Sequence, residues 1–154
     1  MHRPDRDWQP HRVDGVPDGM IVFDGVCVFC SSWVQFVIAR DRMQRFRFTP
    51  VQSAYGSALA RRLGISIEGP ETNAVVFGGR AYFKSDAAIE VLSRLPRWSW
   101  ARILRWAPRP IRDGLYDWIA RRRYRLFGRT EACMAPPPEL AARFVFEQPP
   151  PVAR

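Results

Sequence analysis

Residues 20–30 read "MIVFDGVCVFC" and contain two cysteines, Cys27 and Cys30, just past a short apolar run. The run over residues 20–23 is partly β-branched and is ended by Asp24-Gly25, a turn dipeptide, so it predicts a buried strand. The residues that follow the cysteines, "SSWVQFVIARD", carry apolar side chains at helical spacing. They predict a helix that begins near residues 27–28 and ends near Asp41. The cysteine pair is therefore expected where a strand passes into a helix.

The middle of the chain continues the alternation of strands and helices. Residues 45–49, "RFRFT", alternate charged and aromatic residues before a proline and predict a strand. Ser53 is a suitable N-cap and Gly64 a suitable C-terminal stop for the helix between them. Residues 73–84 place two β-rich runs on either side of a two-glycine turn, which predicts a hairpin.

The rest of the chain is predicted to be helical. Ser85 is the expected N-cap of a helix through "DAAIEVLSRL". Two further helices are expected at roughly residues 98–107 and 111–127, and a short one in "APPPEL" after Cys133. The order strand, helix, strand, helix, strand, strand, helix predicts an α/β fold with a thioredoxin-like central sheet and additional C-terminal helices.

At 154 residues the chain has the length of one domain. We expect a flexible N-terminal arm over residues 1–19 and a thioredoxin-like domain over residues 20–134. That domain would include a helical extension at about 97–128. A proline-rich tail with the short helix would follow at residues 135–154.

The position of the cysteines points to redox chemistry. A thiol at a helix N-terminus lies near free N–H groups and the positive end of the helix dipole, and both lower its pKa. Cys27 is expected there as an exposed nucleophile, with Cys30 one turn further in as a more shielded, resolving thiol. Two other interpretations are half of a zinc site, for which only Cys133, His2 and His11 remain as ligands, and two inert buried cysteines. Redox activity is favoured.

Two more side chains near the pair have open roles. Asp24 either ends the strand by binding local N–H groups or accepts the proton of Cys30 during catalysis. Its negative charge would also raise the pKa of a nearby thiol. Cys133 has no partner at close spacing, which favours a structural or incidental role and leaves exchange with the pair as the alternative.

Composition limits the class of protein. Three cysteines are too few for a secreted disulfide scaffold, and the first 19 residues hold no apolar signal sequence, so a cytoplasmic location is expected. No run reaches the roughly 18 apolar residues of a membrane helix. The net charge is +9, and residues 85–130 hold eleven arginines against four acidic residues.

These arginines alternate with tryptophans in the predicted C-terminal helices. The simplest interpretation is that the apolar face packs on the domain while the arginines face water. Peripheral contact with an anionic membrane surface is an alternative. A nucleic-acid partner is disfavoured because no helix-turn-helix, zinc finger or RNP motif accompanies the charge.

Three stretches together resemble the DCC family of thiol-disulfide oxidoreductases, named for an Asp and two Cys. They are residues 23–53, the hairpin and helix over 74–92, and the segment 109–129 with Cys133 after it. The resemblance covers about residues 20–134 and implies a thioredoxin-like fold. It places the family's Asp on Asp24 and its cysteines on Cys27 and Cys30.

The expected function is therefore thiol-disulfide exchange of the protein-disulfide reductase type. The substrate would be a disulfide-containing protein or a small thiol compound, and the electrons would come from a dithiol protein or glutathione. No metal or organic cofactor is required. The alternative is a basic amphipathic binding module that docks on a membrane surface or an acidic partner, with cysteines that take no part in catalysis.

Overall fold

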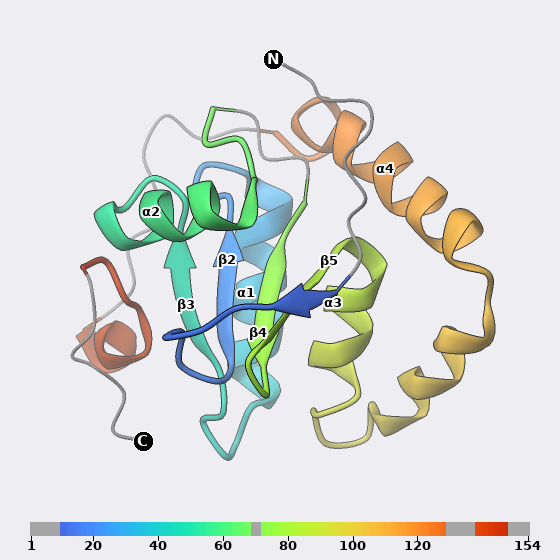
Figure 1. Ribbon diagram of the computed structural model, residues 1–154, viewed down its shortest axis with the longest axis horizontal. Helices are drawn as coiled ribbons and strands as arrows, with labels where there is room; N and C mark the ends of the chain where they lie inside the picture. Colours follow the sequence, from blue (N-terminus) through green and yellow to red (C-terminus); the bar gives the residue numbers. More distant parts are fainter. Residues whose placement is uncertain (1–9, 69–71, 129–137, 148–154) are drawn as a thin grey trace.

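A mixed sheet forms the centre of the molecule (Figure 1). The structure, a computed structural model, describes residues 10–68, 72–128 and 138–147. The strands are β1 (His11–Arg12), β2 (Met20–Phe23), β3 (Arg47–Pro50), β4 (Ala74–Phe77) and β5 (Arg80–Phe83). Their order across the sheet is β1-β5-β4-β2-β3, with β2 parallel to β3 and antiparallel to β4. This is an α/β fold with a thioredoxin-like sheet, as predicted.

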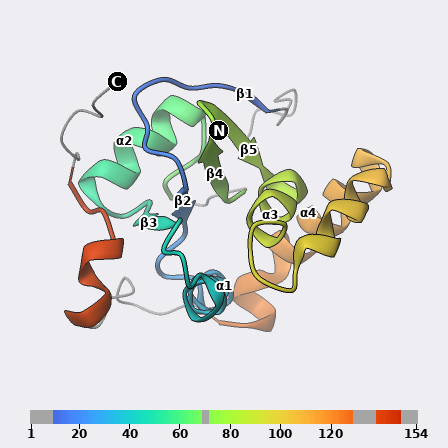
Figure 2. The same ribbon diagram turned by 90° about the horizontal axis from the view of Figure 1, so that it is seen from below.

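Helices cover both faces of the sheet. The α-helices are α1 (Val28–Arg40), α2 (Ala54–Leu63), α3 (Lys84–Leu92) and α4 (Arg109–Leu126), and two 3₁₀ helices are η1 (Ser99–Trp106) and η2 (Pro138–Arg143). Figure 2 shows α2 on one side of the strands and α1 on the other. The side chains of β2 alternate accordingly: Met20 and Val22 join the core under α2, and Ile21 and Phe23 join the core with α1 and α3.

Most predicted boundaries are confirmed within one or two residues. Ser53 accepts a hydrogen bond from the Gly56 N–H at the start of α2, and Gly64 ends that helix with a positive φ of 81°. The hairpin turns at Gly78-Gly79. The predicted helix at 98–107 is a 3₁₀ helix, and the one at 111–127 begins earlier, at Arg109.

The predicted role of Ser85 is wrong. Helix α3 begins at Lys84, after Phe83 as N-cap, and the Lys84 N–H donates its hydrogen bond to the Thr72 hydroxyl at 2.7 Å. The Ser85 hydroxyl donates a hydrogen bond to Asp113 of α4 and accepts one from Arg112 at 2.9 Å. Ser85 thus joins α3 to α4. Its partner Asp113 lies 28 residues further along the chain, so the local sequence does not indicate this contact.

The structure places part of the N-terminal segment. His11–Arg12 pair with β5 in an antiparallel bridge, and Val13 and Val16 are buried in the core under α2. At the other end of the described chain, Phe144 forms a parallel bridge with Phe48 of β3. The proposed domain limits at residues 20 and 134 remain predictions.

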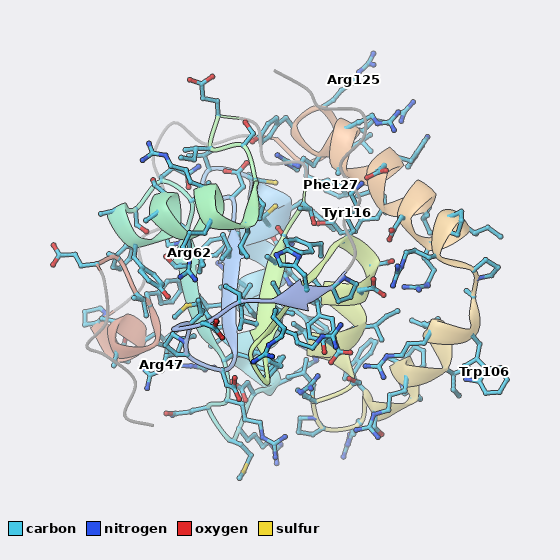
Figure 3. The ribbon with its side chains drawn as sticks, in the orientation of Figure 1. Arg47, Arg62, Trp106, Tyr116, Arg125 and Phe127 are labelled. Carbon is cyan, nitrogen blue, oxygen red and sulfur yellow. The ribbon has the colours of Figure 1, made fainter. Side chains whose placement is uncertain are left out.

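The C-terminal helices η1 and α4 lie along one side of the molecule next to α3 (Figures 1 and 2). Acidic residues of α3 hold them: Asp86 contacts Arg109 and Arg112, at 3.2 and 3.0 Å, and Glu90 pairs with Arg105. The tryptophans do not all face the domain, because Trp106 is 90% exposed and projects from the body (Figure 3). No helix in the described part of the chain is long and apolar enough to cross a membrane.

Candidate active site around the cysteine pair

The cysteine pair lies where the sequence predicts it, between the end of β2 and the start of α1. Cys27 is the N-cap of α1 and has extended backbone torsions, φ −83° and ψ 121°. Its sulfur accepts a hydrogen bond from the backbone N–H of Cys30 at 3.3 Å. Both cysteines are free thiols. The sulfur of Cys27 therefore takes the capping position that an Asp or Ser oxygen occupies in other helices.

The two thiols differ sharply in acidity. The pKa of Cys27 is lowered from 9.0 to about 7, chiefly by a hydrogen bond from the Cys30 side chain. Burial opposes this shift, and the Cys30 N–H and the positive charge of Arg123 add to it. The pKa of Cys30 is raised, first because its proton is held in the bond to Cys27 and second because it is buried. Cys27 is thus the first of the two thiols to lose its proton, and its thiolate is well populated at neutral pH.

The expected exposure of Cys27 is wrong. Its exposed fraction is 0%, and that of Cys30 is 4%. Val28 and Phe29, which lie between the two cysteines in the sequence, are the exposed residues of this first turn, with exposed fractions of 36% and 38%. A substrate reaches the Cys27 sulfur only when neighbouring side chains move aside. The close approach of the two sulfurs, in contrast, agrees with the predicted dithiol.

Asp24 occupies a buried polar cluster beside the pair. One carboxylate oxygen accepts hydrogen bonds from the Val26 N–H at 3.2 Å and the Gln52 side chain at 2.8 Å. The other accepts from the Tyr124 hydroxyl and from the Arg123 guanidinium at 3.4 Å. Gln52 in turn accepts a hydrogen bond from the Gly25 N–H. The strand-ending interpretation of Asp24 is thus seen in its bond to Val26, and long-range partners add to it.

Arg123 and Tyr124 are the site residues that the sequence does not reveal. They come from the last turns of α4, about 100 residues after Asp24. The simplest interpretation of the arginines in residues 85–130, that they face water, is wrong for Arg123, because only 7% of this residue is exposed. The positive charge of Arg123 lies close enough to Cys27 to lower the pKa of its thiol. The pKa of Tyr124 is raised by burial and by its hydrogen bond to Asp24. No local signal marks Arg123 within the run of three arginines.

The end of α4 is fastened to the beginning of α1. The Val28 N–H donates a hydrogen bond to the Gly128 carbonyl at 3.3 Å, and the rings of Phe29 and Phe127 stack with centroids 4.7 Å apart. These contacts hold Arg123 over the cysteine pair. Cys133 lies outside the described residues, and within the described ones no three His, Cys, Asp or Glu side chains gather as a metal site would need.

Comparison with known proteins identifies the family of the chain. The DCC1-like thiol-disulfide oxidoreductase family matches residues 21–129. The uncharacterised protein YuxK of Bacillus subtilis is 36% identical over 84% of this chain and 96% of its own. A chloroplastic DCC family protein of Arabidopsis thaliana is 36% identical over 74% of this chain and 67% of its own. No solved structure matches significantly. With the motif, the fold and these relatives in agreement, the chain belongs to the DCC1-like thiol-disulfide oxidoreductase family.

Proposed function

We propose that the protein is a thiol-disulfide oxidoreductase of the protein-disulfide reductase type, with Cys27 as nucleophile and Cys30 as resolving thiol. One observation carries the proposal: the Cys27 sulfur caps the first turn of α1, where it accepts a hydrogen bond from the backbone N–H of Cys30 at 3.3 Å. That arrangement stabilises one thiolate and holds the second sulfur next to it. Membership of the family supports the general redox role.

The reaction has two exchanges. The Cys27 thiolate attacks one sulfur of the substrate disulfide, forms a mixed disulfide and expels the first substrate thiolate, which takes up a proton. Cys30 then loses its proton and attacks the Cys27 sulfur, which forms the Cys27–Cys30 disulfide and expels the second substrate thiol. Two electrons pass from the protein to the substrate. A dithiol protein or glutathione returns them.

The proposed role of Asp24 is to accept the proton that Cys30 loses in the second exchange. Two features support it. The Asp24 carboxylate is buried, and it lies close enough to both thiols for its negative charge to raise the pKa of each. Arg123 compensates that charge, so that Asp24 can remain close to the Cys27 thiolate. We expect Asp24→Asn to slow the release of the second substrate thiol while the first exchange proceeds.

We further propose that the substrate is a disulfide-containing protein or the disulfide of a small thiol compound, and that the protein acts in the cytoplasm. The chemistry needs only the two sulfurs and protons, so no metal or organic cofactor takes part in it.

Reduction of insulin by dithiothreitol or glutathione tests the proposal. Wild-type protein should accelerate the reaction, and Cys27→Ser should abolish the acceleration. Cys30→Ser should allow at most the first exchange. Equal acceleration by all three proteins, or by none, would refute the assignment of the pair.

A second candidate function is supported by the outer surface of η1 and α4. Large apolar side chains on these helices are at least half exposed, among them Trp100, Ile103, Trp106, Ile111, Leu115 and Trp118. The same two helices carry exposed arginines, such as Arg102, Arg121, Arg122 and Arg125. Tryptophans with arginines suit the headgroup region of an anionic bilayer, so we propose peripheral membrane contact through this surface.

Sedimentation with vesicles tests the second function. Binding to vesicles with phosphatidylserine should exceed binding to neutral phosphatidylcholine vesicles and should weaken with salt. It should fall in Trp106→Ser and persist in Cys27→Ser. Equal binding by the wild type and Trp106→Ser, or to both kinds of vesicle, would rule out this surface.

A further inference from the structure

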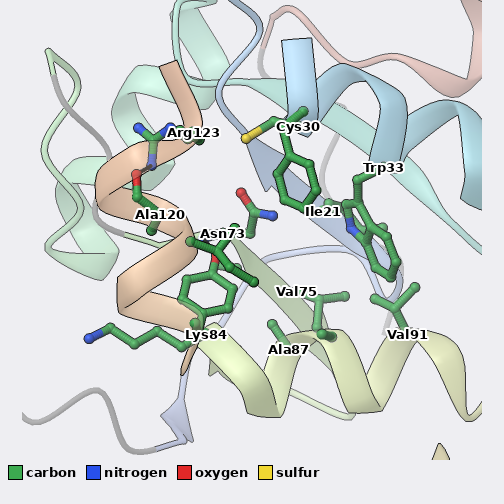
Figure 4. Close-up of a pocket in the computed structure, with 15 residues that line it drawn as sticks. Ile21, Cys30, Trp33, Asn73, Val75, Lys84, Ala87, Val91, Ala120 and Arg123 are labelled. Atoms are coloured by element: carbon green, nitrogen blue, oxygen red, sulfur yellow. Dashed lines mark hydrogen bonds between the residues drawn. The ribbon is translucent and has the colours of Figure 1, made fainter. Parts of the chain in front are cut away.

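A cavity of about 180 Å³ lies beside the cysteine pair, between α1, α3 and α4 (Figure 4). Strands β2 and β4 contribute Ile21 and Val75 to its floor. Trp33 of α1, Val91 of α3 and Ile119 of α4 provide much of its apolar wall. Three helices and the sheet thus leave an apolar space that their own side chains do not fill.

The cavity reaches the redox pair through Cys30. This residue is part of the wall, together with Phe29 before it, and its sulfur points toward the α4 side, where Arg123 lies (Figure 4). The Cys27 sulfur lies 3.3 Å from the backbone nitrogen of Cys30, from which it accepts a hydrogen bond. When Cys27 carries a substrate sulfur, that sulfur lies beside Cys30. The substituent on it is then next to the cavity.

The size and chemistry of the cavity define what can enter. A dry cavity of 150 Å³ with an apolar lining binds benzene, so about 180 Å³ suits a group of the size of an aromatic ring. The charged side chains in the wall are Lys84 and Arg123, both cations. They are paired with Asp117 and Asp24 at 2.8 and 3.4 Å. The cavity therefore favours an apolar group and disfavours a cationic one.

We infer that this cavity is a substrate subsite that receives an apolar, ring-sized group attached near the sulfur of the substrate disulfide. The inference rests on the proposed function and names its substrate class. The group is either a side chain next to a cysteine in a peptide or the body of a small apolar thiol, since both present the same chemistry to the wall. Cationic disulfides are poor substrates.

Binding of an apolar group in the cavity does not change the electron balance of the reaction. The apolar group stays bound while Cys27 forms the mixed disulfide and while Cys30 displaces the substrate thiol. Its binding lowers the free energy of the mixed disulfide and of the preceding complex. The preference therefore appears in kcat/KM for the disulfide that carries the group.

A binding experiment without redox chemistry tests the cavity itself. The probe is 2-phenylethanol, and the protein is the full chain with Cys27→Ser and Cys30→Ser, followed by saturation-transfer NMR. Ala88→Leu on α3 and Ala120→Leu on α4 each add a side chain to the cavity wall. Either should weaken binding about tenfold. Ala58→Leu, at an exposed position of α2 on the opposite face of the sheet, is the matched control and should bind as before.

A kinetic experiment tests the subsite with paired substrates. For a peptide source, the disulfide-linked dimers of N-acetyl-Phe-Cys amide and N-acetyl-Ser-Cys amide are compared. For a small-molecule source, the disulfides of 2-phenylethanethiol and 2-hydroxyethanethiol are compared. The leaving thiols within each pair are similar, so a difference reports the neighbouring group. We expect kcat/KM to be about tenfold higher for the aromatic member of at least one pair. Ala88→Leu should remove that preference, and Ala58→Leu should retain it.

The outcomes separate this inference from the proposed function. Reduction of all four disulfides at similar rates would overturn the subsite and leave the oxidoreductase standing. Phenylethanol binding that Ala88→Leu and Ala120→Leu both leave unchanged would also overturn it. Ring binding that these variants weaken, without reduction of any disulfide, would refute the proposed function and leave an apolar ligand site.

Discussion

At the scale of single residues, the decisive feature is the way in which one buried arginine balances two negative groups. Arg123 bonds to the Asp24 carboxylate and lowers the pKa of the Cys27 thiol. Burying two anions close together without a cation would cost several kcal/mol. The charge of Arg123 therefore allows an acid and a thiolate to coexist in one site.

Removal of this arginine should disturb both stability and acidity. Arg123→Ala leaves the Asp24 carboxylate buried without its ion pair, and we expect the free energy of unfolding to fall by about 3 to 5 kcal/mol. The pKa of Cys27, read from thiolate absorbance at 240 nm, should rise above 7. Adding Asp24→Asn to Arg123→Ala should recover much of the stability.

The matched control is Arg121→Ala, two positions earlier on the exposed side of α4. It should change the free energy of unfolding by no more than about 0.5 kcal/mol. If Arg123→Ala is equally mild, the ion pair with Asp24 has no energetic role.

The lowered pKa of Cys27 also predicts how the stability of the reduced protein depends on pH. The folded state loses the Cys27 proton near pH 7 and the unfolded state near pH 9. Between these values the unfolded state binds more protons, so stability should rise with pH. Relative to Cys27→Ser, we expect the reduced wild type to gain about 1 to 2 kcal/mol from pH 7 to pH 9.

Urea unfolding at several pH values under reducing conditions measures this difference. The raised pKa of Cys30 affects the stability mainly above pH 9. Near that pH the Cys30 thiol of the unfolded chain begins to lose its proton while the folded state keeps it, so the stability then falls as the pH rises further. A difference that stays constant, or that shrinks from pH 7 to pH 9, would show that Cys27 is not acidic in the folded state.

At the scale of elements, α2 begins against the end of β3 at a contact that only glycine permits. A Cβ on Gly56 would lie 1.9 Å from the Pro50 carbonyl oxygen. Gly56→Ala should therefore force α2 away from the strand and destabilise the protein by about 1 to 3 kcal/mol or more. Thermal and urea unfolding measure the effect.

Gly114 supplies the opposite case for the same substitution. It lies within α4, and a Cβ there would meet nothing within 4 Å. Gly114→Ala should raise stability by about 0.5 to 1 kcal/mol, because alanine favours the helix more than glycine does. Equal effects of the two substitutions would contradict the packing of α2 against β3.

The elements also show what a local pattern can predict. Helix α2 follows from Ser53 and Gly64, and the hairpin from its two glycines, because these signals act within a few residues. The way in which α4 packs could not be predicted. Its inward face is set by Asp86 of α3 and by Asp24, which bind Arg112 and Arg123 through long-range contacts. An arginine that neutralises a buried acid looks the same in sequence as one that faces water.

At the scale of the whole molecule, the strand–turn–helix junction was predictable because it depends on neighbours in sequence. Cys27 and Cys30 lie within hydrogen-bond reach, as their spacing requires on a helix. The burial of Cys27 and the cavity at Cys30 were not predictable. Both arise where α1, α3 and α4 converge, and α4 begins at Arg109, far along the chain from the end of α1 at Arg40.

The central claim is that the Cys27 sulfur attacks and the Cys30 sulfur resolves. Mass spectrometry of trapped mixed disulfides tests it most directly, with a disulfide-linked peptide as substrate and Cys133→Ala in every protein. We predict that Cys30→Ser accumulates one peptide on Cys27 and that Cys27→Ser accumulates none at neutral pH. A peptide attached to Cys30 in the Cys27→Ser protein at a comparable rate, or no adduct in either protein, would contradict the account.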